Sequence, residues 1–168
     1  MLTNRYAVVV ESGSDLPDRE ILVSRAWGDV PVSHIQDQEA FNDCSFLDLK
    51  VNKWELNREW SAKQNSELCI RIEKLKGAAL DDFLHRDGSL WPVDLAEKTL
   101  MIIELDEGGS ALDHCLLLRL VSVFMGQFKV YRWSDGIEEV SEEIAASLPA
   151  QQAVLERLIR CEQAISGE

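Results

Sequence analysis

The stretch LMIIELDEGGSALDHCLLLRLVSVFMGQFKVYRW, residues 100–133, decides the fold class. It opens with six mostly apolar residues, 100–105, which have the length and composition of a buried strand. Two glycines interrupt that run. The sequence then predicts a helix over 111–125 and, over 128–133, a second strand whose side chains alternate between two faces. The centre of the chain is therefore a strand–helix–strand unit.

The predicted helix has recognisable ends. Ser110 fits the N-cap, and Asp113, three residues later, fits a capping box near the positive end of the helix dipole. Gly126 fits the left-handed residue that follows many helices. The run is apolar almost all round, which predicts burial on more than one side. Its length of about 15 positions, with Arg119 in the middle, excludes a membrane span, which needs about 20 apolar residues. Such a crossover can join parallel neighbours, and an antiparallel arrangement stays open.

The flanking segments show β-rich or alternating patterns. We expect strands at 6–10, 21–27, 47–52 and 68–73. A short helix over 20–26 is the alternative to the second of these. The fourth competes with a helical pattern, and its β-branched residues favour the strand up to Glu73, followed by a helix from Gly77 to His85.

Turn residues and helical spacing predict the structure of the remaining segments. Residues 28–43 resemble a loop, and Ser134, Asp135 and Gly136 form a turn. Two C-terminal helices follow in the interpretation, with apolar positions at Ile137, Val140, Ile144 and then, after Pro149, at Val154, Leu158, Cys161 and Ile165. The chain is thus expected to form a single α+β domain over residues 1–168. In it, a mostly antiparallel sheet meets the central unit, and the C-terminal helices pack on one face.

The composition and the cysteines indicate the cellular compartment. The chain has 168 residues and is 46% hydrophobic, enough for a core without disulfides. Its four cysteines, Cys44, Cys69, Cys115 and Cys161, are far apart in the sequence, and we expect them to be reduced. The first residues lack the apolar centre of a signal peptide. A cytoplasmic location is therefore expected; in a secreted protein the even cysteine count would suggest disulfides.

The charge is negative and uneven. The formal net charge is −13, and it is concentrated as −5 in residues 1–43, −5 in 87–109 and −6 in 134–168. Such a field repels nucleic acid and anionic membranes and attracts cationic partners. We therefore expect a protein partner with a basic surface, and no direct nucleic-acid or membrane partner.

No motif in the sequence carries a recognisable chemistry. Asp106 and Glu107 precede two glycines between strand and helix, where phosphate loops occur, but the spacing of a nucleotide motif is missing and two carboxylates repel phosphate. With Asp113 they are the only oxygen ligands here for Mg²⁺ or Ca²⁺. The histidines, including His85 and His114, have no partner at metal spacing. We predict neither a cofactor nor a metal.

The strongest candidate for a binding surface is a run of glutamates. Glu138, Glu139, Glu142 and Glu143 fall at spacings that share one side of the expected helix. Like charges four residues apart destabilise a helix mildly. A solvated helix face is the plain interpretation, and a recognition surface for a basic partner is the functional one.

Three classes of function fit these observations. The first is a non-enzymatic, acidic protein-binding module of inhibitor or immunity type, with Glu138, Glu139, Glu142 and Glu143 as its contacts and Asp106 and Glu107 as secondary contacts. The second is a small enzyme whose site assembles only in the fold, near His85, His114 and Asp106, with Glu107 and Cys115 as further candidates. The third is a secretion chaperone or a subunit of a homo-oligomer or larger assembly, for which five tryptophans are notable.

Overall fold

In the computed structural model, which describes residues 3–163, the central unit consists of β5 (Thr99–Leu105), α4 (Ala111–Ser122) and β6 (Lys129–Trp133). Strands β5 and β6 both pair antiparallel with β1 (Arg5–Val10), which lies between them. They therefore run in the same direction without being neighbours, a split β–α–β arrangement. The strand–helix–strand prediction is confirmed.

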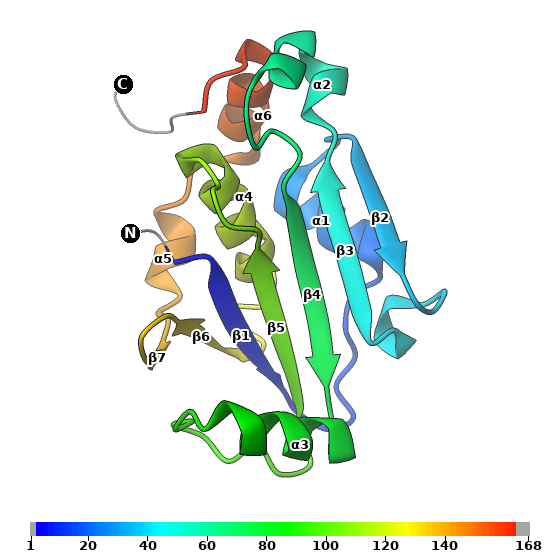
Figure 1. Ribbon diagram of the computed structural model, residues 1–168, viewed down its shortest axis with the longest axis vertical. Helices are drawn as coiled ribbons and strands as arrows, with labels where there is room; N and C mark the ends of the chain where they lie inside the picture. Colours follow the sequence, from blue (N-terminus) through cyan, green and yellow to red (C-terminus); the bar gives the residue numbers. More distant parts are fainter. Residues whose placement is uncertain (1–2, 164–168) are drawn as a thin grey trace.

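The sheet has seven strands in the order β2-β3-β4-β5-β1-β6-β7, and every adjacent pair is antiparallel (Figure 1). The remaining strands are β2 (Val32–Gln36), β3 (Phe46–Val51), β4 (Cys69–Leu75) and β7 (Ile137–Glu139). Together with the helices they form a single α+β domain, as the sequence predicts.

The N-terminus of α4 carries the predicted capping box. The Ser110 hydroxyl accepts from the backbone N–H of Asp113 at 3.3 Å, and Asp113 Oδ2 accepts from the backbone N–H of Ser110 at 2.9 Å. The helix ends at Ser122, three residues before the predicted end. A turn continues the chain to Gly126, which has a φ of +89°, a left-handed conformation that glycine adopts without strain.

One face of the sheet carries the larger core. Helices α1 (Arg19–Trp27), α4 and α6 (Gln151–Arg160) pack there, and their contacts with one another are extensive. Two buried tryptophans link α4 and α6 to neighbouring segments, because each indole N–H donates to a backbone carbonyl of one of these helices. Trp27 donates to Leu116 at 2.9 Å, and Trp60 donates to Leu158 at 2.7 Å.

The opposite face is only half covered. Helix α3 (Gly77–Asp87) and the segment 88–98 pack on β1, β5 and β6 and enclose a smaller core. Trp133 lies at its centre, with the rings of Trp91 and Phe83 edge-on at centroid distances of 5.0 and 5.9 Å.

The uncovered half of that face carries charged side chains in register. One row crosses all seven strands and passes from this half into the smaller core at its end: Ile35, Asp48, Arg71, Glu104, Arg5, Trp133 and Ile137. Arg71 donates two hydrogen bonds to Asp48 at 2.6 and 2.7 Å. The Arg5 guanidinium stacks 3.8 Å from the centre of the Trp133 ring. Alternating charges on adjacent strands stabilise a sheet face that no helix covers.

Three assignments from the sequence are wrong. Residues 21–27 lie in helix α1 instead of a strand, which confirms the helical alternative over 20–26. The expected loop 28–43 contains strand β2 and a short 3₁₀ helix, Phe41–Asp43. The expected helix through Ile137, Val140 and Ile144 is a strand, β7, followed by the one-turn helix α5 (Glu143–Ala146). The backbone N–H of Val140 donates to Val130 at 2.8 Å, so pairing with β6 overrides the local helical spacing.

The other predicted elements agree with the structure. Helix α6 begins after Pro149 and buries Val154 and Leu158, while Ile165 lies outside the described residues. The four cysteines are free thiols, and all but Cys69 are buried. No helix within residues 3–163 is both long enough and apolar enough to span a lipid bilayer.

Candidate functional site

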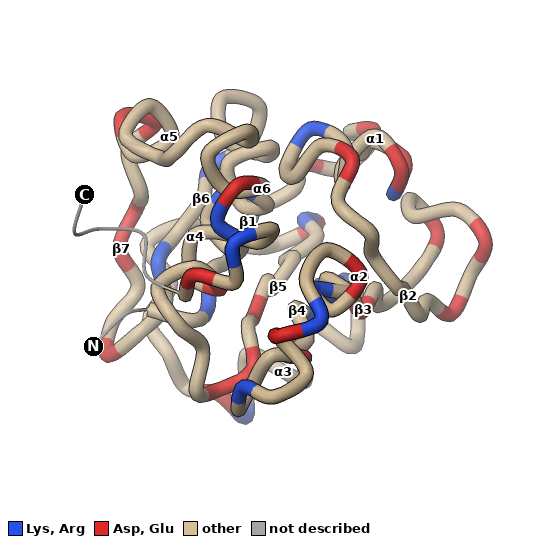
Figure 2. Tube along the Cα trace, turned by 90° about the horizontal axis from the view of Figure 1, so that it is seen from above, with Lys and Arg blue, Asp and Glu red and all other residues tan. Residues whose placement is uncertain are grey.

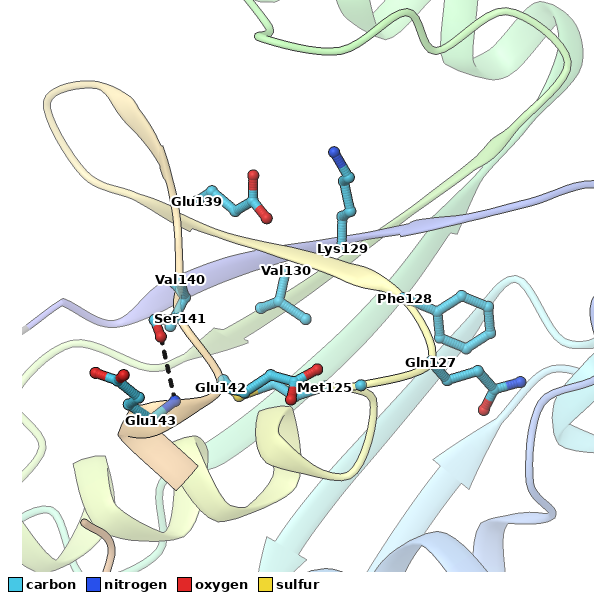
Figure 3. Close-up of a pocket in the computed structure, with 11 residues that line it drawn as sticks. Met125, Gln127, Phe128, Lys129, Val130, Glu139, Val140, Ser141, Glu142 and Glu143 are labelled. Carbon is cyan, nitrogen blue, oxygen red and sulfur yellow. Dashed lines mark hydrogen bonds between the residues drawn. The ribbon is translucent and has the colours of Figure 1, made fainter. Parts of the chain in front are cut away.

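The β6–β7 hairpin and the chain that follows it form a surface hollow of about 770 Å³ (Figure 3). Its floor is the turn from Met125 to Phe128 and the start of β6. Its wall is the segment from Glu139 to Glu143, which leaves the sheet edge and enters α5. We name this hollow the β7–α5 hollow.

Three of the four predicted glutamates line this hollow: Glu139, Glu142 and Glu143. Lys129 is the cation among the lining residues, and it projects to the same side of the hairpin as Glu139 (Figure 3). The hollow therefore has an excess of negative charge. A Cβ atom on Gly126 would lie 3.5 Å from Glu142 Oε1, an ordinary contact distance, so this carboxylate lies beside the turn.

The glutamates reach the hollow by a different route from the expected helix. The backbone N–H of Glu143 is capped by the Ser141 hydroxyl at 3.2 Å, and the one-turn helix α5 starts there (Figure 3). Glu138 does not line the hollow. It lies directly opposite Arg132 on the neighbouring strand, and the two side chains share a face of the sheet. The idea of one stripe of four glutamates on a helix is therefore wrong.

Asp106 and Glu107 lie on a separate surface. They line a hollow of about 490 Å³ with Asp48, Arg71 and Glu104, at the ends of β3, β4 and β5. Asp106 Oδ2 accepts from the backbone N–H of Cys69 at 3.0 Å, so this carboxylate holds the loop after β5 against the start of β4. Five of the six predicted contact residues thus fall on two surfaces that share no residue, and Glu138 lies on neither of them.

Acidic residues as a whole are spread around the molecule. Figure 2 shows Asp and Glu on α1, the turn after β2, β5, β7, α5 and α6, and not on a single side. Some of them are neutralised within the chain, such as Asp48 by Arg71 and Glu162 by Arg157 at 2.6 Å. The described ion pairs within residues 3–163 do not include Glu139, Glu142 or Glu143.

The residues of the enzyme alternative are not brought together. His85 is exposed near the C-terminal end of α3, at one end of β5, whereas His114 and Asp106 lie at the other end. His114 Nδ1 contacts the Thr3 carbonyl oxygen at 3.0 Å. Burial raises the pKa of the Cys115 thiol to about 11, and Arg119 offsets this only in part. A thiol with this pKa is protonated near neutral pH and is a poor nucleophile.

Potential metal ligands are equally dispersed. Within residues 3–163, no group of three or more His, Cys, Asp or Glu side chains gathers in a way that could hold an ion. Asp113, one of the carboxylates considered from the sequence, is already engaged by its capping box and by Lys53.

A buried ion pair is a feature that no pattern in the sequence indicates. Lys53 Nζ donates to Asp113 Oδ1 at 2.5 Å, and only 4% and 5% of the two side chains is exposed. The pair joins α2 (Lys53–Leu56) to the start of α4, and the Lys53 ammonium also lies 4.7 Å from the centre of the Trp60 ring. Sixty residues separate the partners, and no local pattern links them.

Comparison with protein families, with curated proteins and with solved structures adds no relative to this picture. No family model, curated protein or solved structure matches the chain.

Proposed function

We propose that this protein is a non-enzymatic, acidic protein-binding module of inhibitor or immunity type, and that it engages a basic surface of its partner through the β7–α5 hollow. The observation that supports this most directly is that Glu139, Glu142 and Glu143 line one concave surface with a single lysine among them. Concave surfaces that carry a few polar groups are common binding sites.

The electrostatics of the whole chain support the same class. A net charge of −13 raises the encounter rate with a positively charged partner and repels other acidic proteins. The carboxylates of the hollow stand at its rim, where charges affect association rate and salt dependence more than they affect the stability of the fold. Occupation of a basic site on the partner is the way in which such a surface would inhibit.

The test is a pull-down with the immobilised chain from a lysate of its source cells, at low and at high salt. We expect a stoichiometric basic protein that is retained at low salt and released at high salt, because screening weakens attraction between exposed charges. Absence of any stoichiometric partner under both conditions would contradict the proposal.

A pair of charge reversals locates the surface. The double variant Glu139→Lys, Glu143→Lys should weaken the complex by about tenfold or more, equivalent to about 1.4 kcal/mol, with little loss of folding. Asp81→Lys with Asp82→Lys is the matched control, because it changes the net charge equally on exposed positions of α3. Equal weakening by both double variants would show that only total charge matters.

A further inference from the structure

We infer that strand β2 and the adjacent hollow beside α1 form a second docking site, in which an extended, basic segment of another protein adds to the edge of the sheet. This site shares no residue with the β7–α5 hollow. It therefore stands independently of the proposed function.

The first observation is the unpaired edge. Strand β2 ends the sheet on one side, and Figure 1 shows it at the margin of the molecule with α1 behind the β2–β3 pair. The backbone N–H of Asn52 donates to the Pro31 carbonyl at 2.9 Å, so Pro31 and Asn52 form a hydrogen-bonded pair. Along an antiparallel pair, residues that hydrogen-bond to the partner strand alternate with residues that do not. The backbone groups of Ser33 and Ile35 therefore also bond to β3. The N–H and C=O groups of Val32, His34 and Gln36 then point away from the sheet.

The second observation is the composition of that edge. The strand reads Val32, Ser33, His34, Ile35 and Gln36, with no Lys, Arg, Asp or Glu. The Ile35 side chain is exposed, at 66%. Edge strands that must stay unpaired are usually short, charged or interrupted by proline. None of these devices occurs within β2 itself, so its backbone is free to pair with an incoming strand.

The third observation is a hollow in the right place to receive side chains. It has a volume of about 450 Å³ and lies between α1 and the helix-facing side of β2. Its apolar lining includes Val23, Val30 and Val32, and its polar lining includes Glu20 and Asp29. An added strand presents alternate side chains to such a hollow, so that backbone bonds supply affinity and the hollow supplies selectivity.

Charge complementarity assigns a basic occupant. Arg19 and Glu20 in the lining offset each other at 3.7 Å, and Arg19 also donates to Gln36 Oε1 at 3.0 Å. Asp29 in the lining, with Asp37 and Glu39 after the other end of β2, leaves an excess of negative charge. Residues two apart in a strand share a face, so an apolar side chain with lysine or arginine two residues away fits this side of the sheet.

The same charges disfavour a second copy of this chain as the occupant. A symmetric antiparallel pair centred on His34 would place Val32 opposite Gln36 of the copy. It would also bring Asp29, which precedes β2, towards the end of the copy's strand that Asp37 and Glu39 follow. Like charges that approach each other across a strand pair destabilise it.

The experiment uses the isotope-labelled protein and a capped six-residue peptide, Lys-Thr-Val-Thr-Lys-Thr, with amide chemical shifts as the readout. In this lysine–valine peptide, the valine and both lysines lie on one face of the strand. We expect the largest shift changes at Val32, His34 and Gln36 and along α1. The matching peptide of glutamate and valine should bind at least tenfold more weakly. Shift changes confined to other parts of the chain, or equal binding of the two peptides, would overturn the inference.

A proline variant tests the backbone geometry. His34→Pro removes an N–H that faces away from β3, so the ladder to β3 persists while one bond to the added strand is lost. We expect at least tenfold weaker binding of the lysine–valine peptide, and undiminished binding would overturn the inference.

Charge reversal supplies a second variant should His34→Pro not fold. Glu20→Lys with Asp29→Lys should weaken peptide binding at least tenfold, whereas the control Asp81→Lys with Asp82→Lys should change it far less. Equal effects of the two would overturn the inference. So would a concentration-dependent dimer in sedimentation that His34→Pro abolishes, because the edge would then belong to a second copy.

Discussion

The two edges of the sheet are protected to very different degrees. Strand β7 has three residues, two of them glutamates, and the chain turns away into α5 directly after it. Strand β2 has five uncharged residues, an exposed isoleucine and a hollow beside it. Short and charged edges resist pairing with other chains. If both proposals hold, β7 offers side-chain charge to a partner, whereas β2 offers its backbone.

The largest expected effect lies on the β7 side. Trp133 is 5% exposed and holds the β6–β7 hairpin against Trp91, Phe83 and Arg5. Trp133→Ala should lower the free energy of unfolding by about 3–5 kcal/mol, as measured by urea denaturation. Trp54→Ala is the control, because Trp54 is 49% exposed and its loss should cost much less. Equal costs would mean that the hairpin does not depend on this aromatic cluster.

The next effect tests the orientation of the β2 backbone. Ile35→Pro removes an N–H that bonds to Asp48 and should cost about 3 kcal/mol or more. His34→Pro, one residue earlier, removes an outward-facing N–H and should cost clearly less. Thermal or urea unfolding of the two variants gives the comparison. If His34→Pro cost more than Ile35→Pro, the backbone N–H that bonds to β3 would be that of His34 and not that of Ile35.

The smallest effect concerns the turn at the end of β2. The hydroxyl of Ser45 donates to Asp37 Oδ2 at 2.5 Å, and this bond, with backbone N–H groups of Ser45 and Phe46, lowers the pKa of the Asp37 carboxyl. A carboxyl whose pKa is lowered by folding stabilises the protein above its unfolded pKa. That contribution disappears as the pH falls through the folded value.

Stability should therefore decline as the pH falls below about 4, and Asp37→Asn should make that decline shallower. Ser45→Ala, which removes the main cause of the lowered pKa, should flatten the same part of the curve. Urea denaturation between neutral and acidic pH measures both. An acid dependence identical in all three proteins would exclude a role for this turn.

Much of the fold could be predicted because the central unit carries redundant local signals. The apolar run of β5, the capping box at Ser110 and Asp113, and the alternation in β6 point to the same elements. A segment with only one local signal was predicted wrongly. Ile137, Val140 and Ile144 have helical spacing, but the free edge of β6 captures this segment as a strand.

Strand β2 escaped prediction because its pattern is that of an edge. Ile35 faces solvent on the uncovered side of the sheet, whereas the polar His34 faces the helices. The alternation therefore runs opposite to that of a half-buried strand, and only its pairing with β3 defines it. A weak strand pattern next to a proline can therefore indicate an edge strand.

The candidate site was found for a partly wrong reason. Glu139, Glu142 and Glu143 reach the same hollow because they are close in the chain, and not because a helix aligns them. Asp106 was associated with them by charge alone and lies elsewhere. The pairing of Lys53 with Asp113 depends on how α2 meets α4, which is a tertiary property that no local window contains.

The position of β1 has a consequence for synthesis. Val10 leaves the ribosome long before Thr99, its partner on β5, and longer still before Lys129, the partner of Val9 on β6. Strand β1 is thus made before both of its neighbours in the sheet. The nascent chain cannot close this part of the sheet until β5 and β6 have been translated, so Tyr6 to Val10 stay without their strand partners until then.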